Sequence, residues 1–204
     1  MTERLKVISG SMFSGKTDET INLVTRAEIA GRNVQIFKPI IDNRYGAIKE
    51  VRSHSESSHP ATPVSSSLEI LEKIDSGVEI VAIDEAQFFD EDIVAVVSSL
   101  IENDINVIVA GLPLDFKGKP FGKMPKLLAL ADEITRLTAI CTYDVNGEIC
   151  GEEATRTQRF VDGEPANYND PVILVGGKEE GYSARCPDHH IVIDKPQGIV
   201  FEAK

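Results

Sequence analysis

Short apolar runs alternate with longer amphipathic stretches along the first two thirds of the chain. Near-continuous apolar runs occupy residues 5–8, 34–37, 78–83 and 105–110, and a weaker fifth run covers residues 134–140. Runs of this kind are typical of strands that are buried on both faces of a sheet. We therefore expect a sheet that helices cover on both sides.

Helical spacing of apolar residues falls between these runs. One stripe follows Lys16, and the most regular stripe covers residues 93–101 with i, i+3, i+4, i+7 and i+8 spacing. Between them, Ser66 and Glu69 have the spacing of a capping box at the start of a third helix. Strands that alternate with helices predict an α/β fold with a mostly parallel sheet.

Two stretches depart from this alternation. Residues 52–67 are rich in Ser, His and Pro and are expected to form a mobile loop, in which His54 and His59 have no role beyond exposure to solvent. From Cys141 onward the chain is rich in Gly, Asp, Asn and Pro. We interpret residues 1–140 as the main α/β domain and residues 141–204 as a small second domain.

A complete phosphate-binding motif follows the first expected strand. The residues are Gly10, Ser11, Met12, Phe13, Ser14, Gly15, Lys16 and Thr17, which fit the pattern G-x-x-x-x-G-K-[ST] between a strand and a helix. Glycines let the backbone N–H groups turn toward phosphate oxygens, and the helix N-terminus adds positive potential. Lys16 is suited to bridge the β- and γ-phosphates of ATP, and the Thr17 hydroxyl is suited to ligate Mg²⁺. The fold class is therefore a P-loop, RecA-like α/β sheet.

An acidic pair ends the third apolar run. Asp84 and Glu85 follow Ile83 directly, and ligands bind at the carboxyl ends of strands in open α/β sheets. Asp84 is expected to hold Mg²⁺, directly or through water, which leaves Glu85 as a base for an attacking hydroxyl. Acidic residues also favour the start of a helix, but their pairing with a complete phosphate loop favours a catalytic role.

Composition and charge narrow the class of function. The chain has 204 residues, is 42% hydrophobic and carries a formal net charge of −12, which argues against an electrostatic hold on nucleic acid. Because no secretory signal and no apolar run of about 18 residues occurs, we expect a cytoplasmic protein. The three cysteines lie in the last third, where a metal site is more plausible than a disulfide.

Several blocks together resemble the cytosolic, type II thymidine kinases. They are the phosphate loop, the Lys38–Tyr45 segment K-P-I-I-D-N-R-Y, the Asp84–Phe89 segment D-E-A-Q-F-F, K-P-F-G at 119–122, A-T-R-T-Q-R at 154–159 and V-G-G at 175–177. The blocks occur in the same order as in that family and extend from the first strand to His190. The resemblance implies transfer of the γ-phosphate of ATP to the 5′-hydroxyl of thymidine, and deoxyuridine is expected to react as well.

The family also implies roles for individual residues. Glu85 matches the catalytic base, while Asp42 and Arg44 match a segment near the phosphates and the reacting hydroxyl. The residues that match the surroundings of thymine and its sugar, including a lasso-like loop that closes over the base, are Met12, Gln87, Phe88, Leu112, Phe116, Phe121, Thr157, Val172, Leu174, Val175 and Tyr182. Aromatic and apolar residues beyond strand ends are suited to sandwich a flat base. The family further implies a homotetramer and feedback inhibition by thymidine triphosphate.

The tail departs from the two C-x-x-C pairs that hold structural zinc in the family. A segment at 145–149 lengthens the first pair, and the second pair has His where Cys is usual. Since histidine is a good zinc ligand, we expect a site made of Cys141, Cys150, Cys186 and His189. Asp144 in place of Cys150 and His190 in place of His189 remain alternatives, as does a set of buried free cysteines.

Other functions compete with a kinase. A helicase-like motor would share the phosphate loop and the Asp84–Glu85 pair, but the acidic chain disfavours a nucleic-acid track. A GTP-dependent switch would require an N-K-x-D box, which the sequence lacks. A zinc-ribbon interaction module would explain the tail and leave the phosphate loop without a role.

Overall fold

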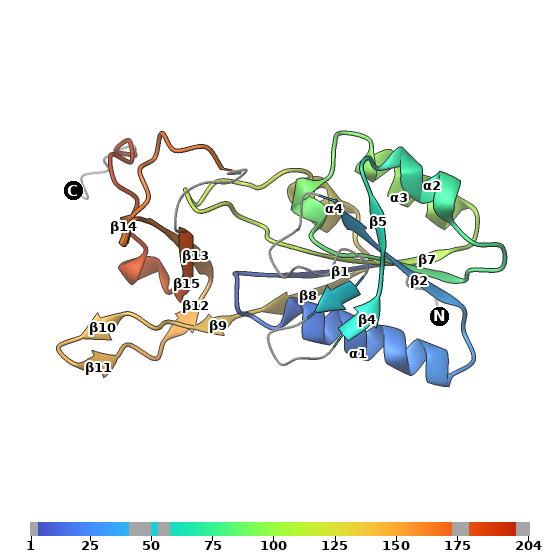
Figure 1. The fold of residues 1–204 in the computed structure, drawn as a ribbon, viewed down its shortest axis with the longest axis horizontal. Helices are drawn as coiled ribbons and strands as arrows, with labels where there is room; N and C mark the ends of the chain where they lie inside the picture. Colours follow the sequence, from blue (N-terminus) through green and yellow to red (C-terminus); the bar gives the residue numbers. More distant parts are fainter. Residues whose placement is uncertain (1–3, 41–49, 53–57, 173–179, 199–204) are drawn as a thin grey trace, which may run out of the picture.

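The computed structural model describes residues 4–40, 50–52, 58–172 and 180–198 of the chain. A six-stranded sheet forms its centre, in the order β5-β2-β6-β7-β1-β8, and every pair of neighbours is parallel (Figure 1). Its strands are β1 (Leu5–Gly10), β2 (Val34–Pro39), β5 (Thr62–Val64), β6 (Ile80–Ile83), β7 (Asn106–Gly111) and β8 (Glu133–Leu137). The predicted parallel α/β sheet is confirmed.

Helices cover both faces of this sheet. Helix α1 (Lys16–Ile29) lies on one face, and α2 (Leu68–Lys73), α3 (Ile93–Glu102) and α4 (Met124–Leu130) lie on the other (Figure 1). Val24 of α1 packs with Ile8 and Ile36, while Ile93 of α3 packs with Val7 on the opposite face. Burying each such side chain contributes about 1.5–3 kcal/mol, which explains why the strands are apolar on both faces.

The register of the strands brings the phosphate loop and the acidic pair to one edge of the sheet. Val7 of β1 and Ile83 of β6 are both level with Val109 of β7, which lies between these strands. Because all three run in the same direction, the loop after β1 and the acidic pair after β6 leave the sheet at the same edge.

The expected loop at 52–67 is wrong for residues 58–64. These residues form β4 (Ser58–Pro60), paired with β3 (Glu50–Arg52), and the edge strand β5. His59 is partly buried, and its Nε2 lies 3.1 Å from a carboxylate oxygen of Glu28, so the expectation of simple exposure is also wrong. His54 lies outside the described residues.

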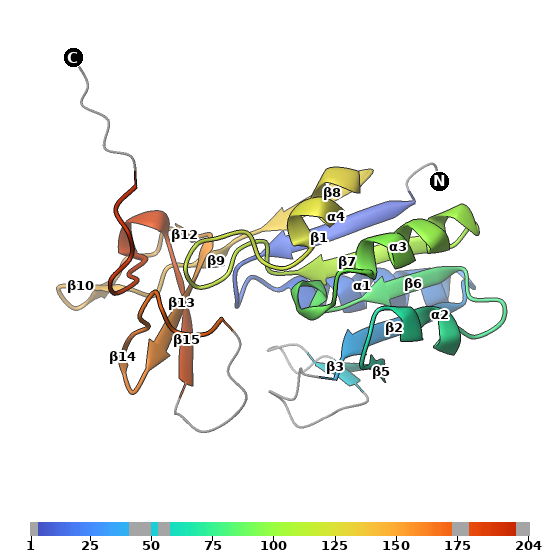
Figure 2. The same cartoon turned by 90° about the horizontal axis from the view of Figure 1, so that it is seen from above.

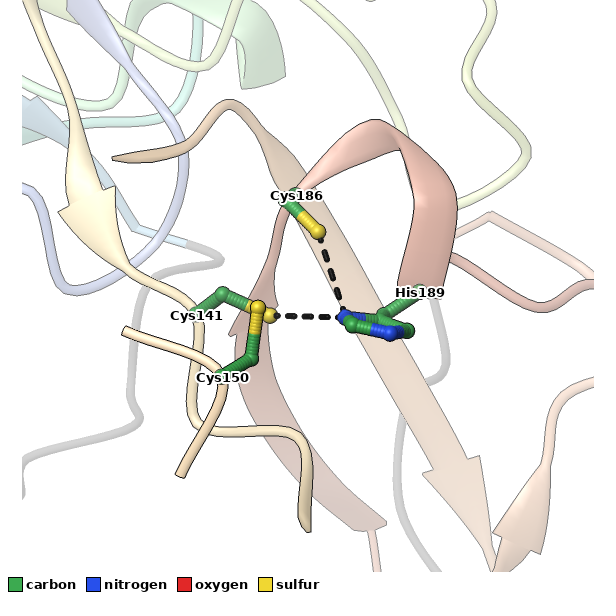
Figure 3. Close-up of side chains that lie close together, drawn as sticks. All are labelled: Cys141, Cys150, Cys186 and His189. Carbon is green, nitrogen blue, oxygen red and sulfur yellow. Dashed lines mark hydrogen bonds between the residues drawn. The ribbon is translucent and has the colours of Figure 1, made fainter. Parts of the chain in front are cut away.

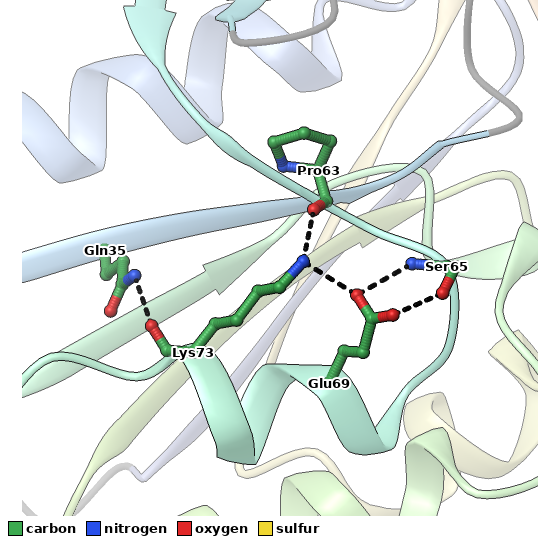
Figure 4. A network of polar contacts seen from close by, with 5 residues as sticks. All are labelled: Gln35, Pro63, Ser65, Glu69 and Lys73. Carbon is green, nitrogen blue, oxygen red and sulfur yellow. Dashed lines mark hydrogen bonds and ion pairs between the residues drawn. The ribbon is translucent and has the colours of Figure 1, made fainter.

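The predicted capping box is shifted by one residue. The carboxylate of Glu69 accepts hydrogen bonds from the backbone N–H and the hydroxyl of Ser65, not from Ser66 (Figure 4). The same carboxylate pairs with Lys73 one turn later at 2.8 Å, and Lys73 also donates to the Pro63 carbonyl at 3.3 Å. Glu69 thus ties the start of α2 to the segment that follows β5.

The C-terminal unit, described over residues 139–172 and 180–198, lies beyond the carboxyl ends of β1 and β7 (Figure 2). The weak run at 134–140 divides into β8 and β9 (Ala139–Ile140), and β9 leads into this unit. Its remaining elements are β10 (Asp144–Val145), β11 (Glu148–Ile149), β12 (Glu153–Ala154), β13 (Arg156–Val161), β14 (Glu164–Pro165), β15 (Glu180–Arg185) and the 3₁₀ turn η2 (Pro187–His189). A further 3₁₀ turn, η1 (Ala86–Phe88), follows β6 in the main sheet region. The division into two domains at residue 140 stays a prediction.

No helix within the described ranges combines the length and the apolar character needed to cross a bilayer.

Candidate functional site

The phosphate loop makes a tight turn between β1 and α1. A Cβ atom on Gly10 would lie 2.4 Å from the Ser14 hydroxyl and 2.5 Å from the Leu137 carbonyl oxygen, so no larger residue fits at that position. Gly15 has φ of 82°, in the left-handed region that favours glycine. Both glycines of the motif are therefore required by the backbone path.

Lys16 begins helix α1 and is buried. Its ammonium group donates a hydrogen bond of 2.8 Å to the carbonyl of Ser11, across the loop. Thr17 follows in the first turn and is partly buried. A lysine, a hydroxyl and a helix N-terminus that converge on one turn form an arrangement suited to bind an anion such as a triphosphate.

Asp84 and Glu85 lie at the end of β6. Asp84 is 5% exposed, and its carboxylate accepts a 2.9 Å hydrogen bond from the backbone N–H of Glu85. Glu85 has φ of 51° and ψ of 43°, a left-handed conformation that costs a residue with a side chain on the order of 1 kcal/mol. This turn directs the chain into η1, which contains Gln87 and Phe88.

Gln87 is buried behind this turn, and its side chain bonds in two directions. Its amide nitrogen donates to the carboxylate of Glu85, and its oxygen accepts a 2.9 Å hydrogen bond from the backbone N–H of Leu112. Gln87 is absent from the residues that line the cavity described next. The substrate contact expected for Gln87 stays untested, and the geometry connects this residue to Glu85 instead.

A cavity opens between the carboxyl edge of the sheet and the C-terminal unit. It is lined by Met12, Phe88, Leu112, Leu114, Asp115, Phe116, Phe121, Thr157, Val172 and Tyr182. The rings of Phe88 and Phe121 meet edge to face with centroids 5.5 Å apart. The family resemblance implied every one of these residues except Leu114 and Asp115. They extend from position 12 to position 182 of the chain, and the fold gathers them around one cavity.

The sequence does not mark Asp115 as a cavity residue, because the residues around it have the pattern of an ordinary turn. Its carboxylate accepts hydrogen bonds of 2.9 Å from the backbone N–H groups of Lys117 and Lys119, and Gly118 completes the turn with φ of 77°. An aspartate that begins a glycine-containing turn needs no further function. The fold nevertheless places this buried carboxylate in the cavity wall.

Arg159 was also missed, although it is fully buried. Its guanidinium lies 5.1 Å from the centre of the Phe116 ring, and one of its nitrogens donates a 2.6 Å hydrogen bond to the Pro171 carbonyl. The guanidinium therefore packs behind one wall of the cavity and holds the chain next to another wall residue, Val172. No local sequence pattern predicts that this strand arginine is buried behind the cavity wall.

Hydrogen bonds join the phosphate loop to the C-terminal unit. The backbone N–H of Met12 donates to the hydroxyl of Thr157 at 3.1 Å, and the hydroxyl of Ser11 donates to the carbonyl of Ala154 at 3.0 Å. The loop is thus hydrogen-bonded to Ala154 of β12 and to Thr157 of β13. Asp42, Arg44, Leu174 and Val175 lie outside the described residues, so their expected roles stay predictions.

Four side chains converge in the C-terminal unit as a candidate metal site (Figure 3). They belong to Cys141, Cys150, Cys186 and His189, and their ligand atoms all lie within 4.8 Å of one another. The Nδ1 atom of His189 lies 3.3 Å from the sulfur of Cys186 and 3.7 Å from that of Cys141. A tetrahedral zinc ion places its ligand atoms roughly 3.5–3.8 Å apart, so the donor set fits zinc.

The two alternative ligands are engaged elsewhere. A carboxylate oxygen of Asp144 accepts the backbone N–H of Gly147 at 2.9 Å, and the Nε2 atom of His190 lies 2.8 Å from the Phe116 carbonyl. The segment at 145–149 forms most of the β10–β11 hairpin, which turns at Asn146 and Gly147. The hairpin closes beside the site, because the backbone N–H of Cys150 bonds to the Tyr143 carbonyl at 2.8 Å.

The thiols of this cluster differ in acidity. Burial raises the pKa of Cys141, but backbone hydrogen bonds from Cys186 and Tyr143 and the contact with His189 outweigh it and bring the pKa to about 6. For Cys150, a backbone hydrogen bond from Glu152 is outweighed by desolvation and by the neighbouring sulfurs of Cys141 and Cys186, so its pKa is raised. Metal ligation requires thiolates, and a bound cation would relieve the repulsion that keeps the second thiol protonated.

Comparison with known proteins identifies the family of this chain. The model of the thymidine kinase family matches residues 3–190. Among solved structures, the large terminase of a thermophilic bacteriophage is similar at a TM-score of 0.42 and 12% identity, over 67% of this chain and 41% of the terminase. The cytoplasmic domain of the Thermomonospora curvata type VII secretion ATPase EccC is similar at a TM-score of 0.42 and 10% identity, over 80% of this chain and 23% of that domain.

Proposed function

The chain belongs to the thymidine kinase family, and from this premise we propose that it transfers the γ-phosphate of ATP to the 5′-hydroxyl of thymidine. The observation that carries the proposal is the position of the cavity. Its wall includes Met12 of the phosphate loop and Phe88, which is three residues from Glu85. A nucleoside in this cavity would therefore lie between the phosphate loop and a carboxylate, as phosphoryl transfer requires.

The proposed reaction assigns one step to Glu85. Its carboxylate accepts the proton of the 5′-hydroxyl as the hydroxyl oxygen forms a bond to the γ-phosphorus. The bond from that phosphorus to the bridging oxygen breaks, and ADP leaves with the electron pair. Lys16 would exchange its bond to the Ser11 carbonyl for the phosphate oxygens.

The oxygen donors at the edge of the sheet suit magnesium. The carboxylate of Asp84 and the hydroxyl of Thr17 are hard ligands of the kind that Mg²⁺ prefers. When bound, Mg²⁺ neutralises charge that develops on the phosphates. We assign Asp84 to this ion rather than to proton transfer, because its carboxylate already accepts the Glu85 backbone N–H.

The aromatic wall of the cavity supports a flat base as the substrate. Phe88, Phe116 and Phe121 offer apolar faces and edges that suit thymine or uracil, so deoxyuridine is a second expected substrate. We propose that zinc at the Cys₃His cluster stabilises the C-terminal unit and does not catalyse, because four protein ligands leave no open position. Feedback inhibition by thymidine triphosphate, a homotetrameric assembly and a cytoplasmic location remain predictions.

A panel of nucleosides with γ-labelled ATP and Mg²⁺ tests the proposal. Thymidine and deoxyuridine should become labelled, while purine nucleosides should not. The competing motor hypothesis expects release of labelled phosphate that DNA stimulates and no labelled nucleoside, a result that would overturn the kinase proposal.

Two variants then test the assigned residues. Glu85→Gln should lower kcat by about 10²–10⁴ while ATP still binds, because the change removes proton transfer and keeps the size of the side chain. Glu91→Gln is the matched control at an exposed position of the neighbouring turn, and it should keep full activity. Wild-type kcat in Glu85→Gln would exclude Glu85 as the base.

A further inference from the structure

Gln87 is a buried polar residue whose side-chain amide forms hydrogen bonds both to the proposed catalytic turn and to a residue of the cavity wall. Its side chain is 2% exposed, its nitrogen donates to the Glu85 carboxylate, and its oxygen accepts the Leu112 N–H. Leu112 lines the cavity, whereas Gln87 does not. The amide therefore bridges a wall of the cavity to the carboxylate that we assign as the base.

The surrounding backbone fixes this bridge in place. A Cβ atom on Gly111 would lie 2.7 Å from the side-chain oxygen of Gln87, and a Cβ on Gly122 would lie 2.3 Å from its carbonyl oxygen. The chain closes on Gln87 from both sides only because these positions are glycine. A buried amide held by two neighbouring segments and by the Leu112 N–H has little freedom to turn, so its nitrogen presents a fixed donor to Glu85.

The conformation of Glu85 shows why a fixed donor matters. Its backbone is in the left-handed region, with the N–H bonded to Asp84, so the side chain leaves the turn from a constrained position. A glutamate side chain still has several rotatable bonds, and proton transfer requires the carboxylate within hydrogen-bond reach of the hydroxyl. The donor of the buried Gln87 amide favours one orientation of this carboxylate.

We propose that Gln87 is a positioning residue that holds the Glu85 carboxylate toward the reacting hydroxyl and links its orientation to the Leu112 wall of the cavity. This role rests on the proposed function, and it differs from the direct contact with substrate that the family resemblance implied for Gln87. A positioning residue acts through Glu85, so its loss should lower kcat and should have no effect once Glu85 can no longer accept a proton.

The test is a double-mutant cycle with Gln87→Glu and Glu85→Gln. Gln87→Glu keeps the size and an acceptor oxygen for the Leu112 N–H, and it replaces the neutral amide donor by a carboxyl group that either shares a proton with the Glu85 carboxylate or repels it. We expect Gln87→Glu to lower kcat at least tenfold, to leave thymidine affinity by calorimetry within about twofold, and to cause no further fall in the Glu85→Gln background. Gln87→Met, which removes both bonds, should show the same lack of additivity.

Gln158 provides the matched control. It is another glutamine with 2% exposure, and it bridges the backbone N–H and carbonyl of Ile191 at 2.8 Å. Gln158→Met should lower the melting temperature, and any effect on kcat should add to that of Glu85→Gln.

Each result decides between distinct conclusions. Additive effects of Gln87→Glu and Glu85→Gln, or a loss of thymidine affinity at unchanged kcat, would overturn the positioning role while the kinase assignment stands. A wild-type protein that phosphorylates no nucleoside would instead remove the proposed function, and the role of Gln87 with it.

Discussion

The backbone N–H of Met12 donates a hydrogen bond to the hydroxyl of Thr157, 3.1 Å away, across the seam between the phosphate loop and β13. Both residues line the same cavity. Thr157 is 5% exposed, so its hydroxyl accepts this hydrogen bond from a buried position. A strand threonine thus joins the region proposed for phosphate to the region proposed for the nucleoside.

Thr157→Val should weaken both stability and thymidine binding. Valine has the same shape without the acceptor, and the partly buried N–H of Met12 would lose its partner at a cost of up to about 1–3 kcal/mol. For a chain of this size, such a loss lowers the melting temperature by roughly 2–4 °C per kcal/mol. Thermal denaturation and calorimetric titration with thymidine measure the two effects. Thr157→Ser, which keeps the hydroxyl, is the control; equal losses in both variants would show that the methyl group and not the hydrogen bond matters.

Removal of the metal should unfold the C-terminal unit before the sheet. The hydrophobic cluster beside the site contains Ala139, Cys141, Ala154, Ala184 and Cys186 as its buried described residues, and two of these five are proposed ligands. We expect one zinc per chain by elemental analysis and loss of near-ultraviolet signal on chelation, with thymidine binding lost in parallel because β13 carries a cavity residue. Retention of the fold and of thymidine binding by metal-free protein would contradict this view.

His189 and His190 allow a matched test of the ligand set. His189 faces the sulfurs of Cys141 and Cys186, stacked on the ring of Tyr143 at 4.3 Å, whereas His190 contacts the Phe116 carbonyl. His189→Ala should lower zinc content well below one per chain, and His190→Ala should keep the metal. The reverse result would assign the fourth ligand to His190, the alternative that the sequence left open.

The sequence predicts the residues that carry the chemistry of the site better than it predicts the long-range contacts that hold them in place. The phosphate loop and the Asp84–Glu85 pair are local patterns, since their chemistry restricts residue types at short spacing. The zinc ligands form two separate groups, which the family resemblance brought together. The bridge from Gln87 to Leu112 spans 25 positions, and no local pattern marks it. Packing around Arg159 could not be predicted for the same reason.

The main error in the fold predicted from the sequence concerns the edge of the sheet. Residues 58–64 contain Ser, His and two prolines, a composition typical of loops. Strand β5 pairs only on its β2 side within the described sheet, and an edge strand tolerates Pro63 because one row of its backbone groups needs no partner strand. Val64 is nevertheless buried in the core with Ile70, which a single apolar residue could not reveal in advance.

Glu69→Gln should make stability less sensitive to acid. The hydrogen bond from Lys73 is the main cause that lowers the pKa of Glu69 to about 2 from 4.5, with further bonds from Ser65. Since the folded pKa lies below the unfolded value, the contribution of this carboxylate to stability is complete above about pH 4.5 and is lost as the pH falls toward 2.

Melting curves from pH 7 to pH 3 should therefore show a difference in melting temperature between wild type and Glu69→Gln that narrows below pH 4.5. Glu72→Gln makes the same charge change at an exposed position of α2 and should lower the melting temperature less at pH 7; a gap for Glu69→Gln that stays constant with pH would contradict the assignment.

Gly122→Ala should destabilise the protein far more than Gly163→Ala. Both glycines have positive φ, 51° and 86°, so alanine at either position costs about 1 kcal/mol of backbone strain. A Cβ at Gly122 would also lie 2.3 Å from the Gln87 carbonyl oxygen, while nothing lies within 4 Å of a Cβ at Gly163. Relief of that overlap must move backbone, which adds about 1–3 kcal/mol and displaces the turn that carries Gln87.

Chemical denaturation should therefore give a loss of unfolding free energy of about 1 kcal/mol for Gly163→Ala and about 3 kcal/mol for Gly122→Ala, and only Gly122→Ala should lower kcat. Equal losses in the two variants would show that positive φ alone sets the requirement for glycine and that the approach to Gln87 is not tight.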